Sequence, residues 1–211
     1  MSSDKSDELR AHSKGERTRA KLLAVAAAEF AQRGYHNTKV GDIVKSAGLS
    51  QPSFYLYFES KEAAYEELVA EFRLRLQTLT RSLLIEKDVD NAELEDHMGL
   101  SFLKFLDFLA DDRDLTEIGF FQPPGCTDTK KGLASWIGSN IAKEQKNGLF
   151  YTDVPAAQIG KVFVGMIDQM ARDPGSRAKR IASAKRCALI LCRGMSIRQP
   201  GESSGPERPR A

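Results

Sequence analysis

Residues 38–61 read TKVGDIVKSAGLSQPSFYLYFESK. Four apolar residues before Gly48 recur at helical spacing, so a short helix with one buried face is expected there. These residues are Val40, Ile43, Val44 and Ala47. Gly48 can adopt the left-handed backbone that ends a helix, Ser50 is a favourable N-cap, and Pro52 falls where the first turn of a helix tolerates proline. The stretch therefore predicts two short helices joined by a glycine turn, which is a helix-turn-helix.

The second of these helices indicates a class of function. Phe54 and Phe58 are expected to point into the core, while the other faces carry side chains that form hydrogen bonds. These side chains are Gln51, Ser53, Tyr55 and Tyr57. Such a helix fits the major groove of DNA, where side chains near its N-terminus reach base edges. We therefore expect this part of the chain to bind DNA.

The preceding residues 19–40, RAKLLAVAAAEFAQRGYHNTKV, extend the pattern. Through AAAEFAQRGY, IVKSAGLSQPSFYLYF and the SKE that opens the next helix, residues 17–67 resemble the DNA-binding head of the TetR family of bacterial transcriptional regulators. The resemblance implies an all-α fold. An N-terminal three-helix helix-turn-helix head would be followed by a larger helical domain for ligand binding and dimerisation, with about nine helices in all.

The resemblance also implies which residues meet DNA. They are Thr38, Lys39, Ser50, Gln51, Pro52, Ser53, Tyr55, Tyr57 and Lys61. Thr38, Lys39 and Lys61 are expected to contact phosphates, which fix register, and the remainder to contact base edges or the DNA backbone. Lys39 stands where the family favours Thr or Ser, so it could replace a hydroxyl contact or point to solvent. Tyr57 could equally pack against the head.

Composition narrows the class of protein. The chain has 211 residues, of which 41% are hydrophobic and 28% charged, as in ordinary globular proteins. No apolar run is long enough to span a membrane, and the polar N-terminus is unlike a secretory signal. Three cysteines without a CxxC motif favour neither a disulfide framework nor a zinc site. We expect a cytoplasmic protein with no membrane association, no cofactor and no metal.

Charge is divided between the two parts of the chain. Residues 10–61 carry nine Lys/Arg and four Asp/Glu, whereas residues 62–115 carry six Lys/Arg and fourteen Asp/Glu. A basic head on an acidic body is the distribution expected when only the head meets phosphate groups.

The chain is expected to divide into four parts. Residues 1–12 would form a disordered arm, 13–60 the DNA-binding head, 61–197 the regulatory and dimerisation domain, and 198–211 a disordered tail. A capping box formed by Ser13 and Glu16 is expected to open the first helix, which would stop at Gly34. Ser60 is expected to cap a long helix that leaves the head. Further helices are expected at about 91–110, 114–121, 127–147, 155–172 and 177–196.

Homodimerisation through the last two long helices follows from the resemblance. The interface candidates are Ile159, Phe163, Ile167, Ala184, Ala188 and Leu191, although these apolar stripes could instead face their own core. A small hydrophobic effector is expected in the second domain. The residues expected to contact it are His97, Phe102, Phe105, Phe121, Trp136, Phe163 and Met166. Any one of them could instead belong to the hydrophobic core.

The favoured function is a ligand-responsive, dimeric repressor that binds a palindromic DNA operator and is released by the effector. The alternative is a DNA-bound scaffold whose second domain binds a protein partner. An enzyme is disfavoured, because the sequence has no nucleophile elbow, phosphate-binding loop, HExxH motif or paired Cys/His cluster.

Overall fold

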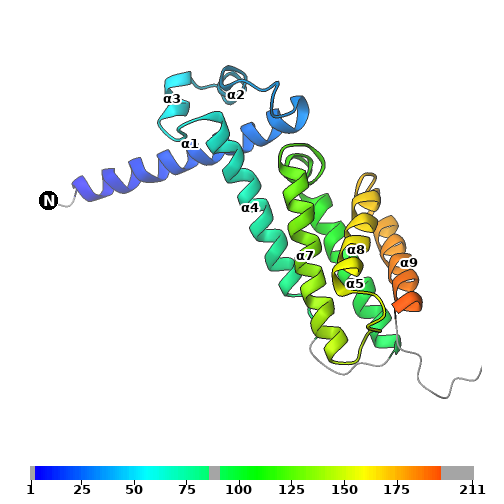
Figure 1. Ribbon diagram of the computed structural model, residues 1–211. Coiled ribbons are helices and arrows are strands. Elements are labelled where there is room, and N and C mark those ends of the chain that lie inside the picture. The colour runs from blue at the N-terminus through cyan, green and yellow to red at the C-terminus, as the bar shows by residue number, and fades with distance from the viewer. Residues whose placement is uncertain (1–2, 86–90, 196–211) are drawn as a thin grey trace, which may run out of the picture.

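The protein is described by a computed structural model over residues 3–85 and 91–195, with side chains described for 14–85 and 93–192. These residues form helices and no β-strand, which confirms the all-α prediction. The elements are α1 (Ser3–Arg33), α2 (Val40–Ala47), α3 (Gln51–Tyr55), α4 (Lys61–Arg81), α5 (Asn91–Asp111), α6 (Arg113–Thr116), the π-helix η1 (Glu117–Phe121), α7 (Gly125–Lys146), α8 (Ala156–Ala171) and α9 (Arg177–Met195). In Figure 1, α1–α3 form a head at one end and α5–α9 a body at the other, joined by α4.

The head follows the expected helix-turn-helix pattern. Gly34 and Gly48 have φ angles of 79° and 67°, the left-handed conformation that glycine adopts without strain, and they end α1 and α2. Apolar side chains of α1, α2 and the α3 region meet in one small core. They include Leu22, Phe30, Ile43, Ala47, Phe54 and Phe58, each at most 4% exposed.

The first helix is longer than expected. It begins at Ser3 instead of Ser13, so residues 3–12, expected as a disordered arm, are helical. Residues 3–12 contain neither proline nor glycine, and α1 tolerates Gly15, so the helix continues from its packed segment near Phe30 to Ser3. Figure 1 shows the N-terminal half of α1 extending past the head. Residues 198–211, the expected tail, lie outside the described residues.

The helix α4 connects the two parts of the molecule. Ser60 caps it as predicted, because the Ser60 hydroxyl accepts a hydrogen bond from the Ala63 amide at 3.1 Å. Its 21 residues correspond to a length of about 30 Å. Phe72 and Leu76 are buried farther along it. The same continuous helix therefore contributes to both the head and the body.

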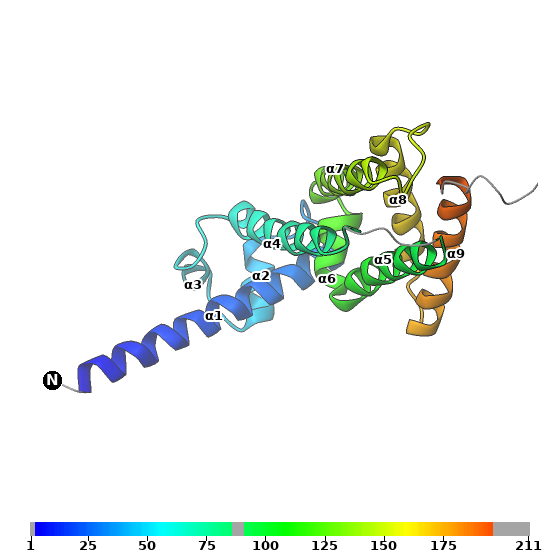
Figure 2. The same cartoon turned by 90° about the horizontal axis from the view of Figure 1, so that it is seen from below.

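The body is built from two helix pairs. The most extensive packing joins α5 to α9 and α7 to α8, and Figure 2 shows α9 next to α5 and α8 next to α7. Gly160 allows the second pair to approach closely, because a Cβ atom there would overlap the Ala134 carbonyl oxygen. None of the helices in residues 3–85 and 91–195 combines the length and apolar character needed to cross a lipid bilayer.

The expected helix at 114–121 is divided into α6 and η1. Gly119 lies where η1 meets α4, since a Cβ atom there would come within 2.6 Å of the Phe72 ring. The wider π turn also buries Ile118 and Phe120. Close approach to α4 and burial of two large side chains accompany the irregular turn, which periodicity alone does not reveal.

Candidate DNA-binding surface and effector cavity

The short helix α3 presents an anchored but exposed surface. Phe54 is fully buried and holds the helix on the head, while Tyr55 is 54% exposed and Leu56 is 80% exposed. Gln51 and Pro52 are also exposed, and Ser53 is half-buried. Leu56 was not predicted from the sequence as a DNA-contacting residue. Its position next to Tyr55, midway between Phe54 and Phe58, could have indicated that it points away from the core. An exposed leucine among these polar groups could contact a thymine methyl group.

Hydrogen bonds order the start of α3. Ser50 is its N-cap, and the Ser50 and Ser53 hydroxyl oxygens lie 2.9 Å apart. The Gln51 carboxamide lies beside α2, because a Cβ atom at Gly41 would be 3.2 Å from Gln51 Nε2. The side chains at the start of α3 are therefore held beside α2 and the turn that precedes α3.

Thr38 does not occupy the exposed position expected for a phosphate contact. It is 1% exposed, and its hydroxyl lies 3.1 Å from the Glu29 carbonyl oxygen and 2.9 Å from that of Gly34. The hydroxyl is thus turned into the head, where it holds the end of α1. Lys39 is the N-cap of α2 and is exposed, and its amide donates to Asp42 Oδ2 at 3.1 Å. Its ammonium group remains a candidate for a phosphate contact.

Lys61 joins the head to α4 instead of pointing outward. Its Nζ atom donates to the carbonyl oxygens of Tyr35 and Thr38, at 3.0 and 3.1 Å. The same atom lies 4.4 Å from the centre of the Tyr35 ring. Two of its three N–H groups are therefore used within the chain, which favours a structural role over the expected phosphate contact.

Tyr57 also differs from the expectation. The helix α3 ends at Tyr55, so Tyr57 lies beyond it, half-buried and packed against the head core. A Cβ atom at Gly15 of α1 would lie 3.8 Å from the Tyr57 hydroxyl. This position agrees with the packing alternative.

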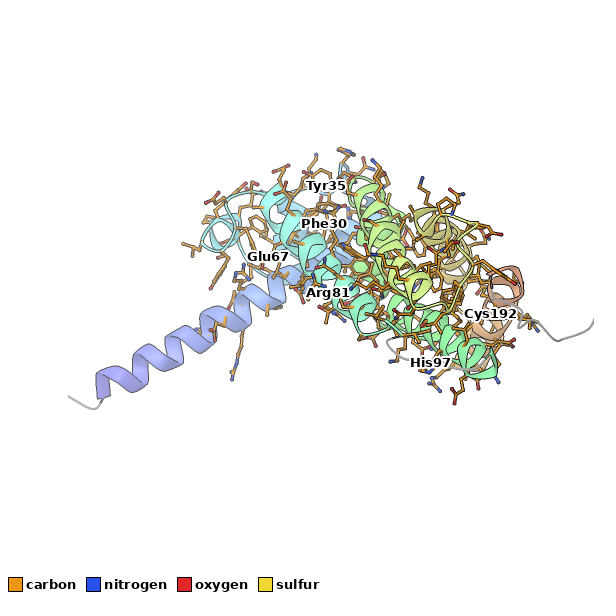
Figure 3. All side chains as sticks on the ribbon, turned by 60° about the horizontal axis from the view of Figure 1, so that its bottom comes forward. Phe30, Tyr35, Glu67, Arg81, His97 and Cys192 are labelled. Atoms are coloured by element: carbon orange, nitrogen blue, oxygen red, sulfur yellow. The ribbon has the colours of Figure 1, made fainter. Side chains whose placement is uncertain are left out.

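An aromatic cluster lies where the head meets α4. The Tyr65 ring is 5.2 Å from that of Phe30 and 4.6 Å from that of Tyr35, and Figure 3 shows Phe30 and Tyr35 next to α4. Tyr35 donates to Glu62 Oε1 at 2.8 Å. Burial, followed by this hydrogen bond to a carboxylate, raises the pKa of Tyr35 to about 12. The phenol therefore stays protonated as a donor to Glu62 at neutral pH.

Direct hydrogen bonds also connect the head to the body. Gln122, just after η1, donates from Nε2 to the Ala31 carbonyl oxygen of α1 at 2.9 Å. The Tyr65 hydroxyl donates to the Ile118 carbonyl oxygen at 3.2 Å and accepts from the Gly125 amide at 3.1 Å. These hydrogen bonds therefore couple η1 and the start of α7 to both α1 and α4, so a displacement of the first two would alter contacts with the others.

A small cavity of about 30 Å³ lies inside the body. Its walls come from the end of α4 and the residues after it, and from α5, α7 and α8. They are Thr80, Leu83, Ile85, Met98, Ser101, Phe105, Ile137, Asn140, Ile141, Glu144 and Phe163. Phe105 and Phe163 were expected at an effector site, and Phe102 stacks on Phe163 with ring centres 4.0 Å apart.

The polar residues of this cavity were missed. Glu144 is 3% exposed and accepts a hydrogen bond from the Ile85 amide at 3.0 Å, and Asn140 donates to the Thr80 carbonyl oxygen at 2.9 Å. Burial raises the pKa of the Glu144 carboxyl above its usual value. No local motif marks these residues, although their spacing of one helical turn places them on one face of α7.

The other residues expected to contact the effector lie outside this cavity. His97 is exposed on α5, at the far end of the body in Figure 3. Trp136 and Met166 are half-buried and do not line the cavity. Phe121 is half-buried beneath cations, with the Arg172 and Arg113 guanidinium groups 5.1 and 5.9 Å from its ring centre. Of the expected set, only Phe105 and Phe163 therefore line the cavity, with Phe102 stacked on Phe163.

The residues expected at a dimer interface face the interior of their own chain. Ile159, Phe163, Ile167, Ala184, Ala188 and Leu191 are all at most 7% exposed. The exposed apolar side chains on the same two helices are Val162, Met170 and Ile190, at 44%, 37% and 64%. Both helices carry apolar side chains on more than one face. The face with the more regular apolar spacing packs into the core of its own chain.

The thiols sit in different surroundings. Cys126 is half-buried, while Cys187 and Cys192 are buried and unpaired. Burial, followed by the nearby Glu95 charge, raises the pKa of Cys192 to about 11, which keeps it protonated at neutral pH. Among the described residues, no group of three or more His, Cys, Asp or Glu side chains could hold a metal ion.

Comparison with known proteins identifies the family. The family model described as "Bacterial regulatory proteins, tetR family" matches residues 22–68. The chain is 40% identical over 179 residues to the uncharacterized HTH-type transcriptional regulator YdgC of Bacillus subtilis (strain 168), covering 81% of this chain and 92% of that protein.

Solved structures share the fold. The ketosteroid transcriptional regulator KstR2 of Mycobacterium tuberculosis aligns over 85% of this chain and 95% of its own, with a TM-score of 0.66 and 21% identity. A gamma-butyrolactone receptor described as ArpA-like aligns over 87% and 90%, with a TM-score of 0.65 and 18% identity. The helix-turn-helix geometry and these relatives together establish a DNA-binding transcriptional regulator, and the chain belongs to the TetR family.

Proposed function

We propose that the protein is a dimeric transcriptional repressor that binds a palindromic operator and is released by a small, mainly apolar effector. The observation that carries this proposal is the exposed face of α3, fixed on a head that α4 connects to a body with an internal cavity. Repression is supported by KstR2 of Mycolicibacterium smegmatis, named a transcriptional repressor, which is 46% identical over 54 residues. That match covers 26% of each chain and therefore bears on the head alone.

The DNA contacts follow from exposure. Gln51, Pro52 and Tyr55 reach base edges, Leu56 adds an apolar contact, and Lys39 meets a phosphate. Thr38 and Lys61 support these side chains by holding the ends of α1 and α4. A palindromic operator follows from two-fold symmetry, which places two copies of α3 in successive major grooves.

The dimer forms through the outer faces of α8 and α9. Val162 and Ile190 supply apolar contact area, and Gly165 lies on the outer face of α8, where an added Cβ atom would meet nothing within 4 Å. This glycine is not required by packing within the chain, and its small size lets a partner helix approach closely. Gly160, by contrast, serves the contact with α7 within the chain.

The effector binds in the cavity beside Phe105 and Phe163. It must bind the DNA-releasing arrangement more tightly than the DNA-bound one, because only that difference shifts the equilibrium. The gamma-butyrolactone receptor with the same fold is, by its name, a small-molecule receptor. The cavity lies at the end of α4, so its occupation acts on the helix that carries the head.

A selection of genomic fragments on the purified protein, repeated with a library of apolar metabolites, tests this function. We expect an enriched palindrome that one class of compound releases. An enriched palindrome that no compound releases would favour a DNA-bound scaffold, and the absence of any enriched sequence would contradict operator binding. Analytical ultracentrifugation of the same sample checks the dimer.

A further inference from the structure

The polar end of the body cavity has an unusual electrostatic character. Glu144 brings a buried carboxyl to it, and none of the described residues that line the cavity is cationic. The hydrogen bond from the Ile85 amide reaches Glu144 Oε1. A carboxyl in such surroundings gains most from a further hydrogen-bond donor or from a positive charge.

The remaining wall of the cavity is apolar. It is formed by side chains from α5, α7, α8 and the residues after α4, namely Leu83, Ile85, Met98, Phe105, Ile137, Ile141 and Phe163. A molecule that fits this space places an apolar skeleton against these residues and one polar group at the Glu144 end.

We propose that Glu144 selects the effector, which is an apolar molecule ending in a hydrogen-bond donor, either a hydroxyl or an ammonium group, and not in a carboxylate. This inference rests on the function proposed above. A hydroxyl or ammonium group donates to Glu144 in addition to the Ile85 amide, since a carboxylate accepts hydrogen bonds at both of its oxygen atoms. A carboxylate would bring a second negative charge beside Glu144, where the cavity lining offers no cation.

The same hydrogen bonds connect the effector to the head. At about 30 Å³ the cavity holds little more than one or two water molecules, so an effector enlarges it. Asn140 and Glu144 hold Thr80 and Ile85, which flank the C-terminal end of α4. An effector bound at Glu144 takes up space beside Thr80 and Ile85, so the cavity opens where α4 ends. The head lies at the other end of this helix.

Three probes with the same chain test the selection. Octan-1-ol, octylammonium and octanoate each contain eight carbon atoms in a straight chain and carry a hydroxyl, an ammonium or a carboxylate group at one end. With the full-length wild-type protein, we expect the first two to raise the melting temperature and to weaken binding to the selected operator. Octanoate at the same concentration should do neither. This comparison needs no variant and so does not depend on the folding of one.

A variant pair assigns the effect to Glu144. We expect Glu144→Gln to weaken octylammonium binding about 10- to 100-fold, the range for loss of a hydrogen bond to a charged group. The same change should strengthen octanoate binding. Glu71→Gln removes an exposed carboxyl on α4 and is the matched control, with all three affinities unchanged. Isothermal titration calorimetry measures each affinity.

The inference is overturned if octanoate binds the wild-type protein as tightly as octylammonium does, if neither donor probe binds, or if Glu144→Gln responds like wild type. Operator binding without any probe separates this result from the proposed function. A protein that prefers octylammonium but binds no operator contradicts the repressor function and supports the selection at Glu144.

Discussion

The head and the body use the same kind of secondary structure in opposite ways. In the head, the functional side chains stand outside a small core, as Tyr55 does at 54% exposure next to the fully buried Phe54. In the body, the polar group with the most distinctive chemistry is Glu144, which is 3% exposed. The exposed face of α3 is accessible to DNA as it stands, whereas the cavity beside Glu144 must enlarge to admit the proposed effector. DNA recognition thus uses a surface that is already formed, whereas the proposed effector response depends on opening of the interior.

The largest expected effect is a loss of operator affinity on substitution of an exposed side chain of α3. Tyr55→Ala should weaken operator binding by about 2–6 kcal/mol, because a dimer loses a base contact of about 1–3 kcal/mol in each half-site. Fluorescence anisotropy with the selected operator measures the loss, and circular dichroism should show unchanged helix content. Leu74→Ala, at a residue 62% exposed on α4, is the control and should bind as wild type does. Unchanged affinity for Tyr55→Ala would contradict the assignment of α3 as the recognition helix.

Two glycines on α8 test the interior and the exterior directly. Gly160→Ala should lower the free energy of unfolding by about 1–3 kcal/mol, since the new Cβ atom overlaps the Ala134 carbonyl oxygen. Gly165→Ala should not destabilise the chain, because its Cβ atom meets nothing within 4 Å and alanine favours a helix by about 1 kcal/mol. Denaturant unfolding compares the two variants. Sedimentation then shows whether Gly165→Ala weakens the dimer, as close helix approach would require.

Two lysines test which cations of the head meet DNA. Lys61→Met should lower stability by about 1–3 kcal/mol, because the Tyr35 and Thr38 carbonyl oxygens lose a charged donor. Its slope of log affinity against log salt should remain that of wild type. Lys39→Met should leave stability unchanged and reduce the slope by roughly one contact per subunit. A reduced slope for Lys61→Met would restore the phosphate contact expected from the family.

The smallest expected effect is a change in pH dependence. Because burial raises the pKa of Glu144 in the folded state, this group contributes stability below the usual carboxyl pKa of 4.5. That contribution is lost as pH rises through the higher folded-state value, since the folded state then binds more protons than the unfolded state. Stability of Glu144→Gln should therefore fall less than that of wild type as pH increases above about 4.5. Melting temperatures measured from pH 4 to 8 check the difference.

Short-range spacing explains why the head could be predicted. Gly48, Ser50 and Ser60 mark helix ends by conformational rules that involve only neighbouring residues, and all three lie where expected. Thr38 and Lys61 show the limit of this reasoning. Their side chains donate hydrogen bonds to backbone carbonyl oxygens of residues up to 26 positions away. A hydroxyl or ammonium group that could contact phosphate thus forms hydrogen bonds within the head.

The helices of the body could be predicted from the sequence, but the residues of its interface and of its cavity could not. The spacing of Ile159, Phe163 and Ile167 identifies an apolar face, yet it does not say whether the same chain or a partner covers that face. Glu144 carries no periodic signal, and its partner Ile85 is 59 residues away. Long-range packing decides both questions.

The two helix pairs of the body also matter for protein engineering. The cavity lies along the seam between them, whereas Gly160 fastens α7 to α8 within a pair. Substitutions along the seam, at Met98 or Ile137 for example, can reshape the cavity without disturbing the α7–α8 contact at Gly160. A library directed at the seam would retain the exposed face of α3 while changing the specificity for the proposed effector. With the effector response proposed above, the fold offers a route to a biosensor with a chosen input and an unchanged output.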